Sequence, residues 1–279
     1  MKIALCNEVI AEMPFEAQCA FAAALGYDSL ELAPYTVGGD APHRMDAKAR
    51  AEVRRAAADA GIGLASLHWL LVRPEGLSIT TANLSVRTRT LDVMRRLVDL
   101  AAELGARVLV HGSPAQRQIP EGDEAAAEAA RQRGRDAFAA VAEEAARAGV
   151  VYCIEALAPP ATNFINRIAE AAEIVRAVGS PALRCMIDCS ATSVVEGPDL
   201  AAVAERWLPT GLIAHVQVND ANRRGPGQGH DRFAGLFAAL RRHNYVGVVA
   251  VEPFDYVPDG PASAARAIGY IRGILEAQS

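Results

Sequence analysis

Short apolar runs alternate along this chain with longer, alanine-rich amphipathic segments. Eight such runs lie at residues 2–6, 28–33, 62–68, 107–112, 151–156, 184–188, 212–218 and 247–252. Segments with helical periodicity follow them at residues 14–25, 47–60, 83–104, 124–148, 163–178, 199–208, 231–243 and 261–276. Parallel strands that are buried on both faces and covered by helices produce this alternation, so we expect an α/β fold.

The connections distinguish the two ends of the predicted sheet. Most helices end at a glycine, as at residues 25–26 and 104–105, and a strand follows closely. The connections from strand to helix at residues 69–82, 113–123 and 219–230 are longer and carry Pro, Gly and polar residues. This asymmetry is typical of a (β/α)8 TIM barrel, whose functional loops lie at the carboxyl end of the strands.

The length of the chain fits one such barrel. A (β/α)8 barrel takes roughly 250 residues, and no linker divides the chain, so residues 1–279 are predicted to form a single domain. The rival architecture is an open doubly wound sheet. The glycine fingerprint expected after its first strand is absent, because the segment reads Cys6-Asn7-Glu8-Val9-Ile10.

Four of the later strands end on residues that can bind a metal ion. They are Glu155, Asp188, the pair His215 and Gln217, and Glu252, and about one strand–helix unit separates each from the next. In a barrel these side chains converge at the carboxyl end. Carboxylates with one amide oxygen or imidazole suit a divalent metal ion such as Mn²⁺, Mg²⁺ or Co²⁺. The structural alternative is that the acids cap helices or pair with arginines.

The pattern of the seventh strand does not decide which residue is the third metal ligand. Alternate residues of a strand share a face, so His215 and Gln217 both point inward or both outward. The bound ion would polarise a hydroxy-ketone and ease removal of the neighbouring proton. Glu155 and Glu252 could then act as a catalytic acid and base pair. Isomerisation, epimerisation and β-elimination of water all fit this arrangement.

Further candidates lie on the loops that follow other strands. Arg223 lies in a glycine-rich loop after the seventh strand and could hold a carboxylate, phosphate or enediolate oxygen. His68 and Trp69 follow the third strand, and His111 ends the fourth. Trp69 could form an apolar wall against a sugar face. For each histidine a satisfied structural role is the alternative to a substrate contact.

Composition limits the classes of partner. The formal net charge is −5 and aromatic residues make up 5% of the chain, which favours neither a nucleic-acid nor a membrane partner. Three of the five cysteines fall in or beside apolar runs and are interpreted as core residues. No signal-peptide core and no run of eighteen apolar residues is present, so a cytoplasmic location is expected.

Several segments in fixed order resemble a known family. The chain resembles the xylose isomerase-like TIM barrels of the sugar phosphate isomerase/epimerase family, which includes ketose 3-epimerases and hydroxypyruvate isomerase. The segments that carry the resemblance are Ala23-Ala-Leu-Gly-Tyr-Asp-Ser-Leu-Glu31-Leu, Leu67-His68-Trp69, His111-Gly-Ser-Pro-Ala-Gln-Arg117, Ile154-Glu155, Ile187-Asp188, His215-Val-Gln217, Pro226-Gly-Gln-Gly229 and Val251-Glu252-Pro253.

The resemblance implies a metal site of Glu155, Asp188, a third ligand and Glu252, in which both glutamates also serve as acid and base. Ketose 3-epimerases place a histidine ligand six residues before a substrate-binding arginine, and counting back from Arg223 gives Gln217. Hydroxypyruvate isomerase has a similar His-x-Gln pair whose glutamine binds the metal. Gln217 is therefore assigned to the metal, and His215 to a deeper layer with a substrate-binding role. The family implies a homodimer or homotetramer.

Two departures concern the substrate. Ketose 3-epimerases carry a substrate-binding glutamate six residues after the first metal glutamate and a histidine three residues after the aspartate. This chain has Ala161 and Ala191 at those positions. A free ketohexose would lose two polar contacts, which favours a smaller, more oxidised or less polar substrate.

The leading hypothesis is a metal-dependent sugar isomerase or epimerase that acts on a hydroxy-ketone carbohydrate through a metal-bound enediolate. The closest rival is a keto-inositol or keto-sugar dehydratase or lyase with the same metal site. An abasic-site endonuclease is a weaker candidate, because it would need more histidines and a basic face. The last alternative is a non-catalytic sugar-binding barrel.

Overall fold

Eight parallel strands form a closed barrel in chain order. The computed structural model describes residues 1–278, and the first strand pairs with both the second and the last. The predicted (β/α)8 barrel is therefore confirmed. The strands are β1 Lys2–Cys6, β2 Ser29–Leu32, β3 Gly63–Leu67, β4 Val108–His111, β5 Val151–Ile154, β6 Leu183–Asp188, β7 Ile213–Val218 and β8 Val248–Val251.

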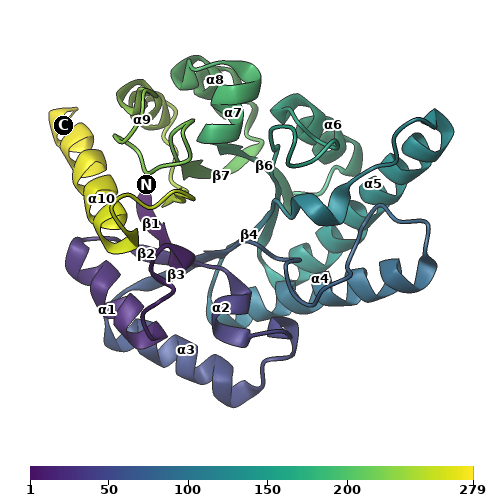
Figure 1. Ribbon diagram of the computed structural model, residues 1–279, viewed down its shortest axis with the longest axis horizontal. Helices are drawn as coiled ribbons and strands as arrows, with labels where there is room; N and C mark the ends of the chain where they lie inside the picture. Colours follow the sequence, from purple (N-terminus) through teal and green to yellow (C-terminus); the bar gives the residue numbers. More distant parts are fainter. Residues whose placement is uncertain (279) are drawn as a thin grey trace.

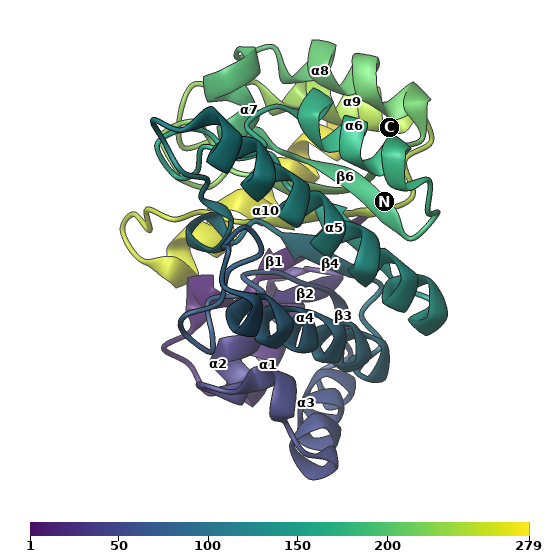
Figure 2. The same cartoon turned by 90° about the vertical axis from the view of Figure 1, so that its right-hand side faces the viewer.

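Helices surround the strands, and Figure 1 shows them following one another around the barrel from α1 to α10. Figure 2 shows α4 and α5, the two longest, lying against one side of the strands. The helices are α1 Phe15–Leu25, α2 Pro34–Gly38, α3 Ala47–Asp59, α4 Leu84–Leu104, α5 Glu124–Ala148, α6 Ile168–Val178, α7 Cys189–Glu196, α8 Leu200–Trp207, α9 Phe233–Arg242 and α10 Gly260–Ala277. Short 3-10 turns are η1 Asn7–Ile10, η2 Pro42–Arg44, η3 Pro114–Arg117 and η4 Leu208–Thr210.

The helix termini follow from local sequence. Asp46, Asn83, Asp123 and Asp259 each accept a hydrogen bond from the backbone N–H three residues ahead. Such caps satisfy donors that the first turn of a helix leaves free, and each contributes about 1 kcal/mol. At the other end, Gly105 takes φ 80° after α4, a conformation that a side chain would oppose.

Two helices and one boundary differ from the sequence prediction. The sequence pattern predicts no helix at α2 or α7, because each begins directly beyond a strand and is too short to show a clear helical period. Helix α6 begins at Ile168 rather than at residue 163. The reason is Asn166, whose side chain donates to the carbonyls of Leu157 and Thr162 and holds the preceding residues as a loop.

The interior of the barrel changes from apolar to polar along its axis. Val108, Val110, Cys153 and Met186 form a buried apolar cluster on the strands. Beyond it, towards the carboxyl ends, the buried side chains are acids, histidines and amides. All five cysteines are buried and unpaired, as expected for core residues. None of the helices within residues 1–278 is long and apolar enough to cross a membrane.

Candidate metal centre and active site

Three carboxylates from separate strands converge at the carboxyl end of the barrel. Glu155 follows β5, Asp188 ends β6 and Glu252 follows β8. One oxygen of each lies within 4.8 Å of an oxygen of the other two, and all three residues are buried. The structure therefore brings together the three acids that the strand-end pattern singled out.

This concentration of acid is electrostatically unfavourable without a cation. Burial raises the pKa of Glu155 well above its usual range, and the charges of Glu252 and Asp188 raise it further. Burial raises the pKa of Glu252 to about 8 although His68 opposes the shift, and burial raises the pKa of Asp188 as well. A divalent cation would supply the positive charge that these acids lack.

Oε2 of Glu252, one of the three acids, is buried and has no hydrogen-bond partner among residues 1–278. Oε1 of Gln217, on the neighbouring strand β7, is buried and unpartnered as well. An unsatisfied buried oxygen is costly unless something absent from the protein completes it. Gln217 also pairs in register with Asp188 on the neighbouring strand. The three carboxylates thus fit a cation bound through oxygen.

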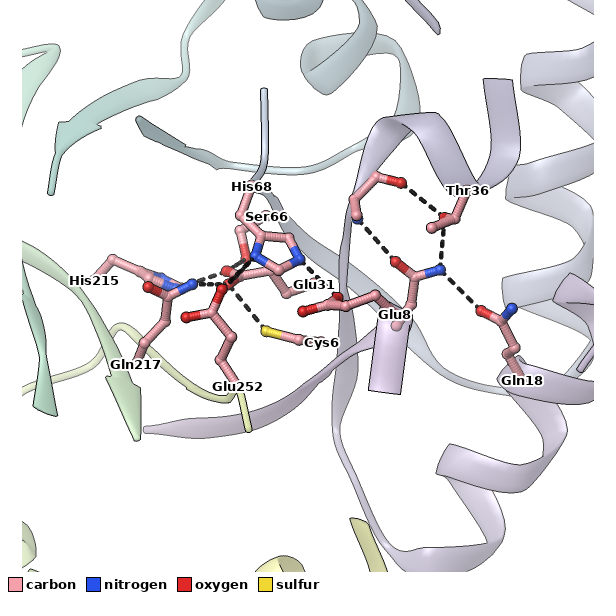
Figure 3. Close-up of polar contacts among 12 residues, drawn as sticks. Cys6, Glu8, Gln18, Glu31, Thr36, Ser66, His68, His215, Gln217 and Glu252 are labelled. Carbon is pink, nitrogen blue, oxygen red and sulfur yellow. Dashed lines mark hydrogen bonds and ion pairs between the residues drawn. The ribbon is translucent and has the colours of Figure 1, made fainter. Parts of the chain in front are cut away.

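Glu31 on β2 holds Gln217 in place by a hydrogen bond (Figure 3). Its Oε1 accepts from Nε2 of Gln217 at 2.7 Å, and its Oε2 lies 2.7 Å from Nε2 of His215. Ser66 and Cys6 also donate to this carboxylate. Burial alone would raise the pKa of Glu31, but the nearby His215 and His68 hold it well below the usual range. With its amide nitrogen fixed to this anion, Gln217 leaves its oxygen free.

His68 connects the carboxylate cluster to a further acid. Its Nδ1 lies 3.0 Å from Oε1 of Glu252, and its Nε2 lies 3.0 Å from Oε2 of Glu8 (Figure 3). Cys6, Glu8, His68 and Glu252 also offer possible ligand atoms within 4.8 Å of one another. Because both ring nitrogens of His68 already face carboxylates, we interpret this group as a hydrogen-bonded chain that fixes Oε1 of Glu252.

Asp188 is fixed by the helix that it begins. Its Oδ1 accepts from the N–H of Ala191 at 2.7 Å and from the hydroxyl of Ser190 at 3.0 Å. Its Oδ2 accepts from Nδ2 of Asn219 at 2.8 Å. The structural alternative from the sequence, that Asp188 caps a helix, is therefore confirmed. A carboxylate has about four lone-pair sites, so capping and metal binding are compatible.

A cavity of about 360 Å³ lies over the carboxylates. Three of the predicted substrate-binding residues line it, namely His68, Trp69 and Arg223. The structure does not bring the other two to its walls. His111 is fully buried, with Nδ1 2.7 Å from the hydroxyl of Tyr152 and its ring edge-on to Phe138. His215 lies one layer deeper, against Glu31.

Sequence reasoning missed the supporting residues of the site. Glu8 and Asn219 hold His68 and Asp188, and Glu31 holds Gln217. Arg117 is fully buried and donates to the backbone carbonyl of Glu155 at 2.7 Å. A charged residue inside an apolar strand, as at Glu31, is a signal that could have been followed, because full burial of an acid requires partners.

Three residues that line the cavity have a strained backbone conformation. They are Trp69, Ser113 and Arg223, and each takes a positive φ, of 50°, 40° and 68°. Local contacts hold them there. The hydroxyl of Ser113 accepts from the N–H of Leu71, and the carbonyl of Arg223 accepts from the N–H groups of Phe254 and Asp255. Residues in this region cost about 1–3 kcal/mol each and cluster at functional sites.

Gly112 gives the first testable prediction. A Cβ atom at this position would lie 2.2 Å from Oε2 of Glu155. Replacing Gly112 by alanine is therefore expected to displace that carboxylate and weaken Mn²⁺ binding at least tenfold, measured by calorimetric titration. Gly273→Ala is the control, because its Cβ would meet nothing within 4 Å. Unchanged Mn²⁺ affinity in Gly112→Ala would contradict the placement of Glu155.

Comparison with known proteins extends these observations. Residues 19–274 match the sequence model of the family described as Xylose isomerase-like TIM barrel. A D-psicose 3-epimerase of Agrobacterium fabrum is 32% identical over 122 residues, which are 44% of this chain and 41% of that protein. The corresponding enzyme of Ruminiclostridium cellulolyticum is 28% identical over 123 residues, with the same coverage. The match thus spans about two fifths of the length of these curated relatives.

Solved structures share the fold over nearly the whole chain. A D-psicose 3-epimerase crystallised in the presence of D-fructose superposes with a TM-score of 0.82 at 21% identity and covers 99% of both chains. The 3-keto-D-glucoside 4-epimerase of E. coli superposes with a TM-score of 0.83 at 20% identity, covering 98% of this chain and 99% of that one. These likenesses establish the architecture.

Proposed function

This chain belongs to the xylose isomerase-like TIM barrel family, and on that premise we propose that it is an epimerase or isomerase that acts on a hydroxy-ketone carbohydrate with a divalent metal ion. One observation carries the proposal. Glu155, Asp188 and Glu252 converge within 4.8 Å beneath a cavity, and Oε2 of Glu252 is buried without a partner among the described residues. The partial match to two D-psicose 3-epimerases supports the same class of reaction.

The chemistry follows from the positions of the two glutamates. When bound, a divalent cation at this centre would polarise the substrate carbonyl. Glu155 and Glu252 reach the cavity from β5 and β8, which β6 and β7 separate in the barrel. We assign one of them to remove the proton from the carbon beside the carbonyl, leaving an enediolate. The other returns a proton to the opposite face and yields the epimer.

The remaining roles follow from the lining of the cavity. All four proposed ligands, Glu155, Asp188, Gln217 and Glu252, offer oxygen, which favours Mn²⁺, Mg²⁺ or Co²⁺. His68 fixes Glu252 by a hydrogen bond and borders the cavity. Trp69 and Arg223 stand at its mouth and are proposed to contact a small carbohydrate substrate.

Solvent exchange tests this proposal directly. The protein loaded with Mn²⁺ is incubated with D-psicose and related keto-sugars in D₂O, and the products are analysed by NMR. We expect deuterium at the carbon next to the carbonyl, both in recovered substrate and in its epimer. Loss of water without an epimer would instead identify a keto-sugar dehydratase or lyase with the same metal site. Absence of any deuterium incorporation across the sugars would refute proton transfer at this centre.

A further inference from the structure

The cavity has a polar floor and an apolar wall. Glu155, Asp188, Glu252 and His68 form the floor, where the reacting carbons are proposed to lie. The wall on one side comes from the loop that follows β5, residues 157–161, and from α7. This loop contributes Leu, Ala, two Pro and Ala, and carries no hydrogen-bonding side chain.

Val194 on α7 is the strongest indication that this wall binds an apolar group. Its side chain is 61% exposed, and it lines the cavity. Among the described residues, three other large hydrophobics are exposed, namely Leu84, Val246 and Tyr270, and none of them lies at this cavity. On the other side, Trp69 and Phe254 present aromatic surface, with their rings edge-to-face at a centroid distance of 6.3 Å.

Two hydroxyl groups at the cavity are already engaged within the protein, whereas Nε1 of Trp69 is buried with no hydrogen-bond partner among the described residues. The hydroxyl of Ser190 donates to Asp188, and that of Ser113 accepts from a backbone N–H. The guanidinium of Arg223 lies over the ring of Phe254, 5.1 Å from its centroid. Ala161 and Ala191 border the cavity and offer nothing to a hydroxyl group. A sugar hydroxyl placed against this wall would lose its water and gain no partner.

Charge disfavours an anionic group at this wall, because the residues of the loop 157–161 and of α7 that line the cavity carry no cation. Of the described residues that line the cavity, only His68 and Arg223 are cationic or can become so. His68 is held between two carboxylates, and Arg223 is stacked on Phe254. Phosphate groups are usually held by convergent cations or helix N-termini. The cavity volume of about 360 Å³ falls within the range of sites that hold drug-sized ligands.

We infer that the substrate is a neutral hydroxy-ketone sugar that carries an apolar substituent, an O-alkyl or O-aryl group, on the end remote from the reacting carbons. The wall of Leu157, Pro160 and Val194 binds this substituent, with Phe254 facing it across the cavity, while the sugar head meets the carboxylates. The inference rests on the proposed function for the orientation of the head. Burial of apolar surface at the wall supplies the affinity that the missing polar contacts do not.

Binding measurements test the inference independently of turnover. Calorimetry on the Mn²⁺-loaded protein compares D-psicose, 6-O-benzyl-D-psicose and D-psicose 6-phosphate. We expect the benzyl sugar to bind at least tenfold more tightly than D-psicose, and the phosphate to bind more weakly than either. Val194→Asn is expected to remove most of this preference. Val246→Asn is the matched control, because Val246 is equally apolar, is 88% exposed and lies away from the cavity.

The outcomes separate the two proposals. Equal affinity for the three sugars, or tightest binding of the phosphate, would overturn the apolar wall even if D-psicose is epimerised. A benzyl preference that Val194→Asn leaves intact would also overturn it. If the benzyl sugar binds tightly through Val194 but exchanges no deuterium, the binding inference stands and the proposed reaction fails.

Discussion

Replacing Glu155 or Glu252 by glutamine is expected to lower the rate at which the deuterated epimer forms by about a hundred- to ten-thousandfold, the usual contribution of a positioned acid or base. Glutamine keeps the size of the side chain but cannot accept a proton from carbon. Because the two residues act on one proton-transfer sequence, the double substitution is expected to cost little more than either single one. Exchange followed by NMR in D₂O, with Mn²⁺ at saturation, provides the measurement.

These substitutions also have a predictable effect on stability. Burial and neighbouring acids raise the pKa of Glu155, so its ionised form destabilises the metal-free fold at neutral pH. Glu155→Gln should therefore raise the melting temperature without metal, which excludes unfolding as the cause of lost activity. Glu143→Gln, on the exposed face of α5, is the control. Undiminished formation of the deuterated epimer in both active-site variants would contradict the assignment of the two glutamates as acid and base.

Metal removal is expected to abolish exchange and to lower the melting temperature. A ligand at one hundred times its Kd stabilises a folded protein by about 2.7 kcal/mol. For a chain of this size, this corresponds to a rise of roughly 5–10 °C on adding Mn²⁺ to chelated protein. The increase follows because the cation binds the three acids only when the barrel brings them together. Differential scanning calorimetry at fixed pH measures it.

Asp188→Asn separates metal binding from folding. Asparagine is as good a helix N-cap as aspartate, so α7 should still form. The loss of one charged ligand should remove most of the rise in melting temperature that Mn²⁺ causes. Asp59→Asn, on the exposed end of α3, should keep the full rise. A full rise in Asp188→Asn would mean that the cation binds elsewhere.

The architecture and the carboxylate cluster could be predicted because both are encoded in local pattern. Buried strands give apolar runs, and parallel strands of a barrel bring their carboxyl ends together, so Glu155, Asp188 and Glu252 had to converge. The resemblance to the xylose isomerase-like barrels is confirmed by the family match. The choice of Gln217 over His215 came from the resemblance, because strand periodicity treats the two residues alike; it stays a prediction.

The contacts that could not be predicted from the sequence depend on the direction of side chains and on partners that are distant in the chain. His111 ends a strand, as His68 nearly does, yet it turns to Tyr152 and Phe138 while His68 meets Glu252. Glu31 and Gln217 are far apart in the chain, and their hydrogen bond exists only once the barrel closes. No periodicity records such contacts. The same holds for Glu8, which became part of the site through His68 alone.

The strained backbone of Trp69, Ser113 and Arg223 lowers the stability of the fold at residues that also shape the cavity. Each residue takes a conformation that glycine would adopt more readily, at a cost of about 1–3 kcal/mol that the rest of the barrel offsets. Directed evolution for thermal survival alone is therefore expected to accumulate glycine or asparagine at these three positions. A screen that also demands turnover would reject them, since the same residues line the cavity that is proposed to bind the substrate.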